Sequence, residues 1–257
     1  MFREKFILQG VIMRRRRRKD ADKKLLSYKD YIINGMVEQV FIESKDEDQY
    51  LNPFDNRIFI KDEVYKNIIE NYRGKWSQVF ENDNPIHIEV GTGRGKFITS
   101  LAKLNPDINY IALEIKEEVL LRAVEKADKL KLDNILFLWG GVELFDLYFE
   151  DKELDRVYIN FCDPWPKKRN AKRRLTSSLF IDLYDKKLNN GQIHFKTDNR
   201  DLFEFSLNEF SSKDLRLSNI SLDLAKSDFE GNVTTEYEDK FMGLGMPIYR
   251  LEAEFRK

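Results

Sequence analysis

From Pro85 onward, the chain alternates between two patterns of apolar residues. Short runs rich in β-branched and aromatic residues predict strands, and longer stretches with apolar residues at helical spacing predict helices. The strands are expected at 86–90, 110–113, 135–138, 156–160 and 192–195, and the helices at 96–104, 117–130, 174–188 and 200–210. This alternation indicates an α/β fold with a parallel sheet covered on both faces. Two last runs, 215–223 and 247–254, lack a long helix between them and predict an antiparallel edge.

The chain before Trp76 has weaker periodicity and an acidic, polar stretch at 43–49 that is typical of a loop. We expect residues 1–75 to form a basic N-terminal extension with a variable segment, and residues 76–257 to form one domain. A chain of 257 residues suffices for a single large α/β core. Met13, directly before an arginine run, is an alternative start.

Composition narrows the class of protein. With 42% hydrophobic and 35% charged residues, the chain is typical of a globular protein. Its single cysteine, Cys162, excludes an internal disulfide and gives no reason to expect a metal site. We find no membrane-spanning run and no leader peptide, so we expect a cytoplasmic protein. His87 and His194 fall inside predicted strands, where packing is a more common role than catalysis.

Positive charge is clustered although the net charge is only −1. Residues 14–24 hold eight cations and two acids, and residues 167–174 hold six cations and no acid. One such run is commonly a solvated surface, but two make a nucleic-acid partner credible.

A glycine-rich turn, Gly91-Thr-Gly93-Arg-Gly95, follows the first predicted strand. Its spacing departs from the dinucleotide-binding fingerprint, and Glu89 just before it would repel a pyrophosphate. The next strand ends at Glu114, where nucleotide-binding folds place an acid on a ribose. Two strand-end acids beside a glycine turn suit S-adenosylmethionine, which carries positive charge and a ribose. The alternative is that both acids merely make salt bridges at the strand ends.

The fourth strand leads into Asn160-Phe-Cys-Asp163-Pro-Trp165-Pro, directly before the second basic run. Ligands of open α/β sheets bind at the carboxyl ends of the strands, so we expect Asp163 to face the same crevice as the glycine turn. Two prolines stiffen this segment, and Trp165 offers an aromatic face to a base.

Together these motifs resemble those of the bacterial tRNA (guanine-N7)-methyltransferases. The resemblance runs from Gly74 to the C-terminus and includes Gly74-Lys-Trp76, residues 89–93, 160–169 and 172–175, Phe195-Lys-Thr-Asp198, and Thr235-Glu-Tyr-Glu238 with Phe241. It implies a Rossmann-like class I fold with a seven-stranded sheet, S-adenosylmethionine as methyl donor, S-adenosylhomocysteine as product, and guanosine 46 of the tRNA variable loop as acceptor. No metal is implied, and relatives occur as monomers or homodimers.

Matching positions imply roles for individual residues. Asp163 is the expected catalytic residue and lies where cofactor and substrate meet. The expected cofactor-binding residues are Glu89, Gly91, Gly93, Glu114, Gly141 and Asp163; the substrate-binding residues are Lys167, Asp198, Thr235, Glu236, Tyr237 and Glu238; the RNA-binding residues are Arg169, Asn170, Ala171, Lys172, Arg173 and Arg174.

Two positions depart from the family pattern. Many relatives carry an acid where this chain has Gly141, so the adenine contact falls to the backbone or to Glu143. Asn170 replaces a frequent histidine, which we expect to alter an RNA contact rather than the chemistry. No role is assigned to 28–72.

Guanine N7 is an in-plane lone pair, so no proton must leave before it attacks a methyl group. We expect Asp163 to hold the guanine N1 and N2 hydrogens, with Asp198, Glu238 and Thr235 assisting. Two other classes stay open: a nicotinamide oxidoreductase, disfavoured by the glycine spacing, and a noncatalytic RNA-binding protein, which the loss of the acid at Gly141 would allow.

Overall fold

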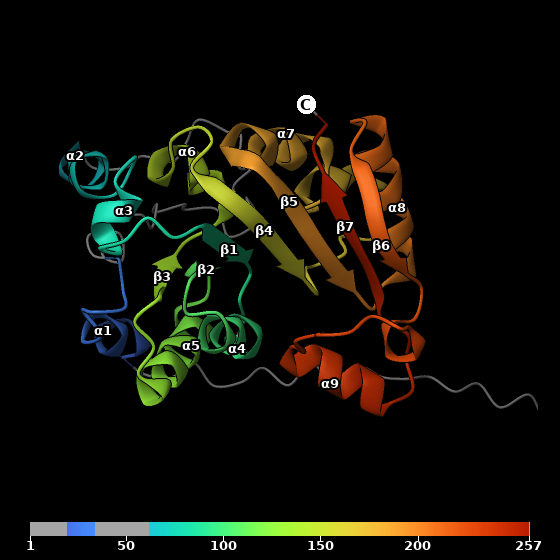
Figure 1. Ribbon diagram of the computed structural model, residues 1–257, viewed down its shortest axis with the longest axis horizontal. Helices are drawn as coiled ribbons and strands as arrows, with labels where there is room; N and C mark the ends of the chain where they lie inside the picture. The colour runs from blue at the N-terminus through green and yellow to red at the C-terminus, as the bar shows by residue number, and fades with distance from the viewer. Residues whose placement is uncertain (1–19, 34–61, 257) are drawn as a thin grey trace, which may run out of the picture.

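Seven strands form a single sheet in the order β3-β2-β1-β4-β5-β7-β6 (Figure 1). The computed structural model describes residues 20–33 and 62–256. β1 to β5 are parallel, whereas β7 runs antiparallel to both β5 and β6, as the sequence predicted. The strands are β1 (Ile86–Val90), β2 (Asn109–Glu114), β3 (Ile135–Trp139), β4 (Leu154–Asn160), β5 (Leu188–Thr197), β6 (Arg216–Ser221) and β7 (Tyr249–Glu254).

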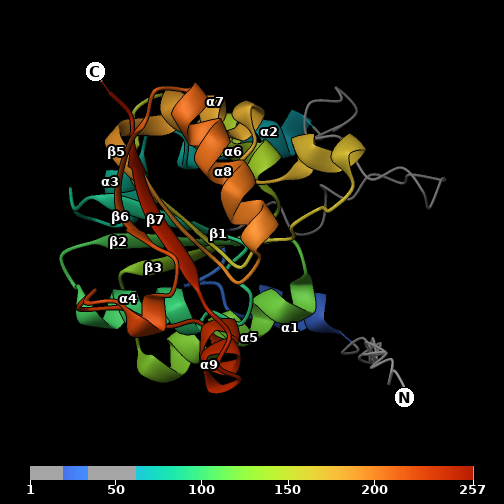
Figure 2. The same ribbon diagram turned by 90° about the vertical axis from the view of Figure 1, so that its right-hand side faces the viewer.

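Helices cover both faces of the sheet (Figures 1 and 2). One layer contains α1 (Ala21–Leu26), α4 (Lys96–Leu104), α5 (Glu117–Leu130) and α9 (Glu236–Gly243). The other contains α2 (Asp62–Asn71), α3 (Trp76–Val79), α6 (Phe145–Tyr148), α7 (Ser178–Lys187) and α8 (Arg200–Ser212). Short 3₁₀ turns are η1 (Val142–Leu144), η2 (Lys168–Arg173) and η3 (Leu224–Lys226).

The helix predicted at 174–188 begins four residues later than expected, at Ser178. Arg174 lies just beyond η2 and has an extended backbone, so no helix begins there. Its side chain donates to the backbone carbonyls of Pro164 and Trp165 in the preceding loop. The helices predicted at 96–104 and 117–130 have the expected bounds.

Apolar side chains pack on both faces of the sheet, but one face, which we call the polar face, also carries buried polar groups on β1, β4 and β5. The opposite face packs Ile88, Val157 and Phe195 into the core beneath α3, α6, α7 and α8. On the polar face, register places Tyr158 beside His194. His87 Nδ1 lies 3.2 Å from the Tyr158 hydroxyl, and burial lowers the pKa of His87 to about 3. The pKa of the half-buried His194 is also lowered to about 3, chiefly by burial, so both imidazoles are neutral, which supports the packing role predicted for these histidines.

Residues 20–33 lie against the outer strand of the sheet. The amide of Ile33 donates to the Phe137 carbonyl over 3.2 Å, and the Phe137 amide donates to the Tyr31 carbonyl over 2.9 Å. Lys24 on α1 forms an ion pair of 2.6 Å with Glu125 on α5. This part of the expected extension therefore packs on the sheet domain, while the arginine run and residues 34–61 lie outside the described residues. The boundary at residue 75 stays a prediction.

Candidate active site

The turn between β1 and α4 contains three glycines in the left-handed region, with φ of 78° at Gly91, 59° at Gly93 and 76° at Gly95. A Cβ atom added at Gly91 or Gly93 would meet nothing within 4 Å, so both line open space. At Gly95 it would lie 2.6 Å from the Ala123 Cβ, because α4 and α5 approach closely there. The turn thus combines tight helix packing with a backbone open to a ligand.

Glu89, near the end of β1, is a buried carboxylate held by two donors. Thr92 Oγ1 donates to Oε2 over 2.7 Å, and Asn160 Nδ2 donates to Oε1 over 2.9 Å. Burial raises the pKa of Glu89 to about 7, although these hydrogen bonds and the charge of Lys196 oppose the rise. A positively charged ligand group beside Glu89 would favour its ionised form.

Glu114, at the end of β2, accepts hydrogen bonds from two backbone amides, one of which belongs to the same glycine turn. Its Oε2 accepts from the Gly93 amide over 3.0 Å, and its Oε1 accepts from the Lys116 amide over 3.1 Å. Burial raises its pKa, against the opposing effect of these backbone donors. The structure therefore brings the two predicted strand-end acids to one turn, where each accepts a hydrogen bond from a turn residue, Thr92 or Gly93.

The segment after β4 reaches the same edge of the sheet. Asn160, which binds Glu89, is the last residue of β4, and the exposed Asp163 follows three positions later. Burial raises the pKa of Cys162 to about 12, which disfavours the reactive thiolate form at neutral pH. Asp163 is thus joined by a short chain segment to the residue that orients Glu89.

The basic segment, residues 167–174, contains both exposed cations and cations that contact the preceding loop. Lys167, Lys168, Arg169 and Lys172 are exposed, while Asn170 and Ala171 are half-buried. Arg174 Nε donates to the Pro164 carbonyl over 3.0 Å and its Nη2 to the Trp165 carbonyl over 3.1 Å. The Arg173 guanidinium lies 5.0 Å from the centre of the Trp165 ring. The last two arginines therefore brace the loop that carries Asp163.

Among the residues predicted to bind substrate, Thr235 and Glu238 are buried. They form a capping box at the start of α9, in which Thr235 Oγ1 accepts from the Glu238 amide. Glu238 is 0% exposed; its Oε2 lies 2.6 Å from Lys196 Nζ, and its Oε1 accepts from Asn232 over 2.6 Å. These contacts make Glu238 an anchor of α9 in this structure.

Other predicted substrate residues are accessible. Tyr237 is 57% exposed, Lys167 is exposed, and Asp198 is half-exposed just after β5. Glu236 forms an ion pair of 2.8 Å with Lys126 on α5.

Sequence reasoning missed Lys196 and Asn160 as parts of the site. Lys196 Nζ binds Glu238, the Val233 carbonyl at 2.9 Å and Asn232 at 3.3 Å, and burial lowers its pKa. Asn160 ends the strand predicted at 156–160, and Lys196 directly follows the one predicted at 192–195, so period-two alternation along these strands was a signal that pointed to both.

Gly141 lies beside another carboxylate, that of the half-buried Glu143. A Cβ atom at Gly141 would lie 2.2 Å from Glu143 Oε2, so the Glu143 side chain fills the space that a residue at 141 would enter. Burial raises the pKa of Glu143.

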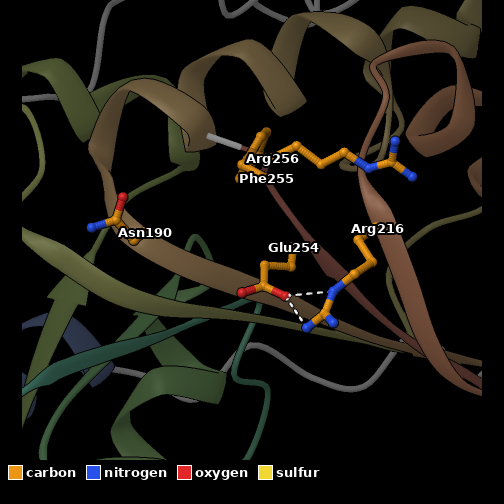
Figure 3. A pocket seen from close by; sticks show the side chains of 5 residues that line it. All are labelled: Asn190, Arg216, Glu254, Phe255 and Arg256. Atoms are coloured by element: carbon orange, nitrogen blue, oxygen red, sulfur yellow. Dashed lines mark hydrogen bonds and ion pairs between the residues drawn. The ribbon is translucent and has the colours of Figure 1, made fainter.

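Two cavities bear on where a ligand can lie. The first, about 290 Å³ and crossed by the Arg216–Glu254 ion pair, is lined by residues near the amino-terminal end of β5 (Figure 3). That end is opposite the glycine turn. The second, about 180 Å³, adjoins Asn160 and Lys196 and extends along the polar face to His194 and Arg250. Of these two cavities, the second is the one lined by a partner of a strand-end acid, since Asn160 binds Glu89.

Within residues 20–33 and 62–256, no group of three or more His, Cys, Asp or Glu side chains is arranged to hold a metal ion. No helix in the same ranges combines the length and apolarity needed to cross a membrane.

The sheet order, the antiparallel β7 and the glycine turn after β1 define a Rossmann-like class I methyltransferase fold. The solved structure described as an antibiotic-related methyltransferase shares the fold, with a TM-score of 0.53 and 18% identity over 72% of this chain and 94% of that one. The 16S rRNA methyltransferase KamB has a TM-score of 0.51 and 12% identity over 76% and 94% of the two chains.

Sequence comparison identifies the family. The family described as "Putative methyltransferase" matches residues 83–251. The tRNA (guanine-N(7)-)-methyltransferase of Clostridioides difficile is 56% identical over 95% of this chain and 100% of its own length. That of Bacillus licheniformis is 55% identical over 72% of this chain and 87% of its own. The chain belongs to the family of bacterial tRNA (guanine-N7)-methyltransferases.

Proposed function

We propose that this protein transfers the methyl group of S-adenosylmethionine to N7 of a guanine in tRNA, at guanosine 46 of the variable loop. The N7 lone pair forms the new bond to carbon as the carbon–sulfur bond breaks, which leaves 7-methylguanosine and S-adenosylhomocysteine. The observation that carries this proposal is the pair of acids, Glu89 and Glu114, which accept hydrogen bonds from the same glycine turn. Family membership supports the same reaction.

The residues present fit the methyl donor. Gly91 and Gly93 leave space against the backbone, and the buried Glu89 carboxylate gains from a cation beside it. Glu114 keeps free lone pairs that can accept from a ribose diol. When bound, S-adenosylmethionine supplies an electrophilic methyl group on a positively charged sulfur.

Glu143 is our choice for the adenine contact that many relatives make with an acid at position 141. The Glu143 carboxylate reaches the space beside the Gly141 Cα. Replacing Glu143 with Gln should weaken cofactor binding while leaving RNA binding unchanged.

Asp163 is the group we assign to the guanine. An exposed carboxylate there accepts from the N1 and N2 hydrogens, orients the ring and stabilises the positive charge that methylation develops. Alignment of this kind contributes roughly 7 to 11 kcal/mol in favourable cases. Lys167, Asp198 and Tyr237 are accessible enough to contact the same nucleotide.

The exposed cations of the basic segment and the arginine run at 14–18 are assigned to the tRNA backbone. Guanine N7 in folded tRNA becomes accessible when the nucleotide is extruded, as for other enzymes that modify bases. We place the protein in the cytoplasm, where tRNA is modified, and leave monomer and homodimer as alternatives.

The test is methyl transfer from isotopically labelled S-adenosylmethionine to an unmodified tRNA transcript, with the product nucleoside identified by mass spectrometry. We expect labelled 7-methylguanosine, and no label in a transcript whose guanosine 46 is replaced by adenosine. Label in another nucleoside, or none at all, would contradict the proposal.

A further inference from the structure

Three aromatic rings lie together beyond the end of β4. Phe161 and Tyr237 have ring centres 6.3 Å apart and planes 21° apart. Phe241 lies 6.2 Å from each, with its plane 27° from that of Phe161 and 25° from that of Tyr237. We call these three residues the aromatic platform. Their rings share nearly one orientation although they come from two segments of the chain.

The aromatic platform adjoins the proposed active site. Phe161 directly follows Asn160, which binds Glu89, and it precedes Asp163 by two residues. Its outermost ring is exposed, since Tyr237 is 57% accessible to solvent. The Lys240 ammonium lies 5.4 Å from the centre of the Phe241 ring and adds positive charge at the edge of the platform.

The backbone holds these rings in place. Phe161 has a φ of 52°, a left-handed conformation that an aromatic residue rarely adopts, and its amide donates to the Lys196 carbonyl over 2.9 Å. Such strain persists where the surroundings over-determine the conformation, and it clusters at functional sites.

Helix α9, which carries the other two rings, is fastened to three elements. Lys196 on β5 binds Glu238, Lys126 on α5 binds Glu236 over 2.8 Å, and Lys96 on α4 binds both Thr234 and Asp239. These bonds hold α9 in place, and with it the exposed Tyr237 ring beside Phe161.

We propose that the aromatic platform is the stacking surface for the extruded guanine during methylation. The proposal rests on the proposed function and adds the residues that hold the base. Aromatic side chains stack on any base face, and neighbouring cations suit an RNA ligand. The platform therefore supplies affinity and orientation, whereas the choice of guanine falls to hydrogen-bonding groups such as Asp163.

The first test compares the steady-state kinetics of four variants. Tyr237→Ala and Phe241→Leu should raise KM for tRNA by about 5- to 100-fold, the range expected for removing one stacked ring. Tyr237→Phe keeps the ring and should stay within about twofold of the parent protein. Leu222→Ala, which removes a side chain that is 64% exposed elsewhere, is the matched control and should change nothing.

The second test reads the base directly, with 2-aminopurine in place of the target guanine in a tRNA saturated with protein. Stacking on aromatic rings quenches this fluorophore, so the bound signal should be brighter with Tyr237→Ala than with the parent protein or Tyr237→Phe. Thermal unfolding midpoints within a few degrees of the parent would show that the variants fold.

The outcomes separate the two proposals. If the parent protein forms no 7-methylguanosine, the proposed function fails. If it does, but Tyr237→Ala and Phe241→Leu leave both KM and fluorescence unchanged, the platform proposal alone is overturned. A fluorescence response only from 2-aminopurine at the flanking nucleotide would also overturn it.

Discussion

Glu89 illustrates how burial changes the pKa of a carboxylate. Its side chain is 2% exposed and accepts from Thr92 and Asn160, yet its pKa is raised to about 7. Because the pKa is raised, an acid of this kind binds a proton more tightly in the folded protein than in the unfolded chain. Glu89 therefore contributes to the stability of the folded protein at pH values below its pKa in the unfolded chain, and this contribution is lost as pH rises through about 7.

Cofactor affinity should therefore depend on pH. A cationic ligand selects the ionised form of Glu89, so affinity for S-adenosylmethionine should fall as pH decreases from 8 to 6, approaching about tenfold per pH unit below the pKa. Isothermal titration calorimetry in buffers of different ionisation enthalpy should detect proton release on binding. Glu89→Gln should bind more weakly and show a flatter pH profile; an unchanged profile in this variant would assign the effect to another group.

At Asp163, the expected effect is on turnover rather than on RNA binding. Asp163→Ala should lower kcat by about 100-fold or more, comparable to removing one group that stabilises a transition state. Its Kd for tRNA should stay within a few-fold, measured by filter binding. Asp201→Ala, an exposed acid in the first turn of α8, serves as the control and should keep full activity. Strong residual turnover in Asp163→Ala would remove Asp163 from this role.

At the scale of elements, α9 depends on contacts far apart in the sequence. Its eight residues carry few buried side chains, and Glu238 is the one that is fully enclosed. The partner of Glu238 is Lys196, on β5, and both side chains are almost completely buried. A buried charge that loses its partner is costly, so this ion pair ties the position of α9 to the edge of the sheet.

Breaking that ion pair should destabilise the protein. Glu238→Ala leaves the Lys196 ammonium buried without its carboxylate and should lower the free energy of unfolding by about 3 to 5 kcal/mol. The double variant Lys196→Met with Glu238→Leu removes both charges and should recover most of that loss. Denaturant unfolding checks both; equal losses in the single and double variants would mean that side-chain packing, rather than the unpaired charge, is responsible.

At the scale of the whole molecule, the parallel strands bring their carboxyl ends to one edge of the sheet. Most of the residues assigned to the methyl donor, the guanine and the phosphates lie at these strand ends or in the segments that directly follow them. The basic segment after β4 and the arginine run near the N-terminus are separate in the chain, and both are assigned to RNA. Electrostatic contacts with phosphates make affinity depend on salt, which offers a way to count them.

Replacing Lys168, Arg169 and Lys172 together with Gln should flatten the slope of log K against log salt concentration by about 2, since each phosphate that is no longer neutralised changes the slope by roughly 0.7 to 0.9. The same change at residues 14–18 should flatten it further. Arg174→Gln should instead lower kcat, because Arg174 binds the Pro164 and Trp165 carbonyls. Fluorescence anisotropy across a salt series measures the slopes; equal slopes for all proteins would exclude these cations as phosphate ligands.

Local patterns were enough to predict the seven strands and four of the helices around them, α4, α5, α7 and α8. Alternating runs and the Glu89–Gly95 turn are short-range signals, and the parallel topology then placed Glu114 near the turn. Local patterns could not predict the ion pair between Lys196 and Glu238, because 42 residues separate the two in the sequence. Charge alone also does not distinguish Arg174, which braces a loop, from the exposed Arg169. Helix α9 was not predicted because it has few apolar residues at helical spacing, although the capping box of Thr235 and Glu238 is a sequence signal for the start of a helix.

Lys196 has a wider consequence, because its ammonium is felt by Glu89 as well as by Glu238. A ligand that alters the ionisation of Glu89 changes the electrostatic field at the same cation that fastens α9. Thermodynamic linkage makes any such influence reciprocal. On the proposed function, we therefore expect the methyl donor and the RNA to change each other's affinity by the same factor, through the shared Lys196 cation.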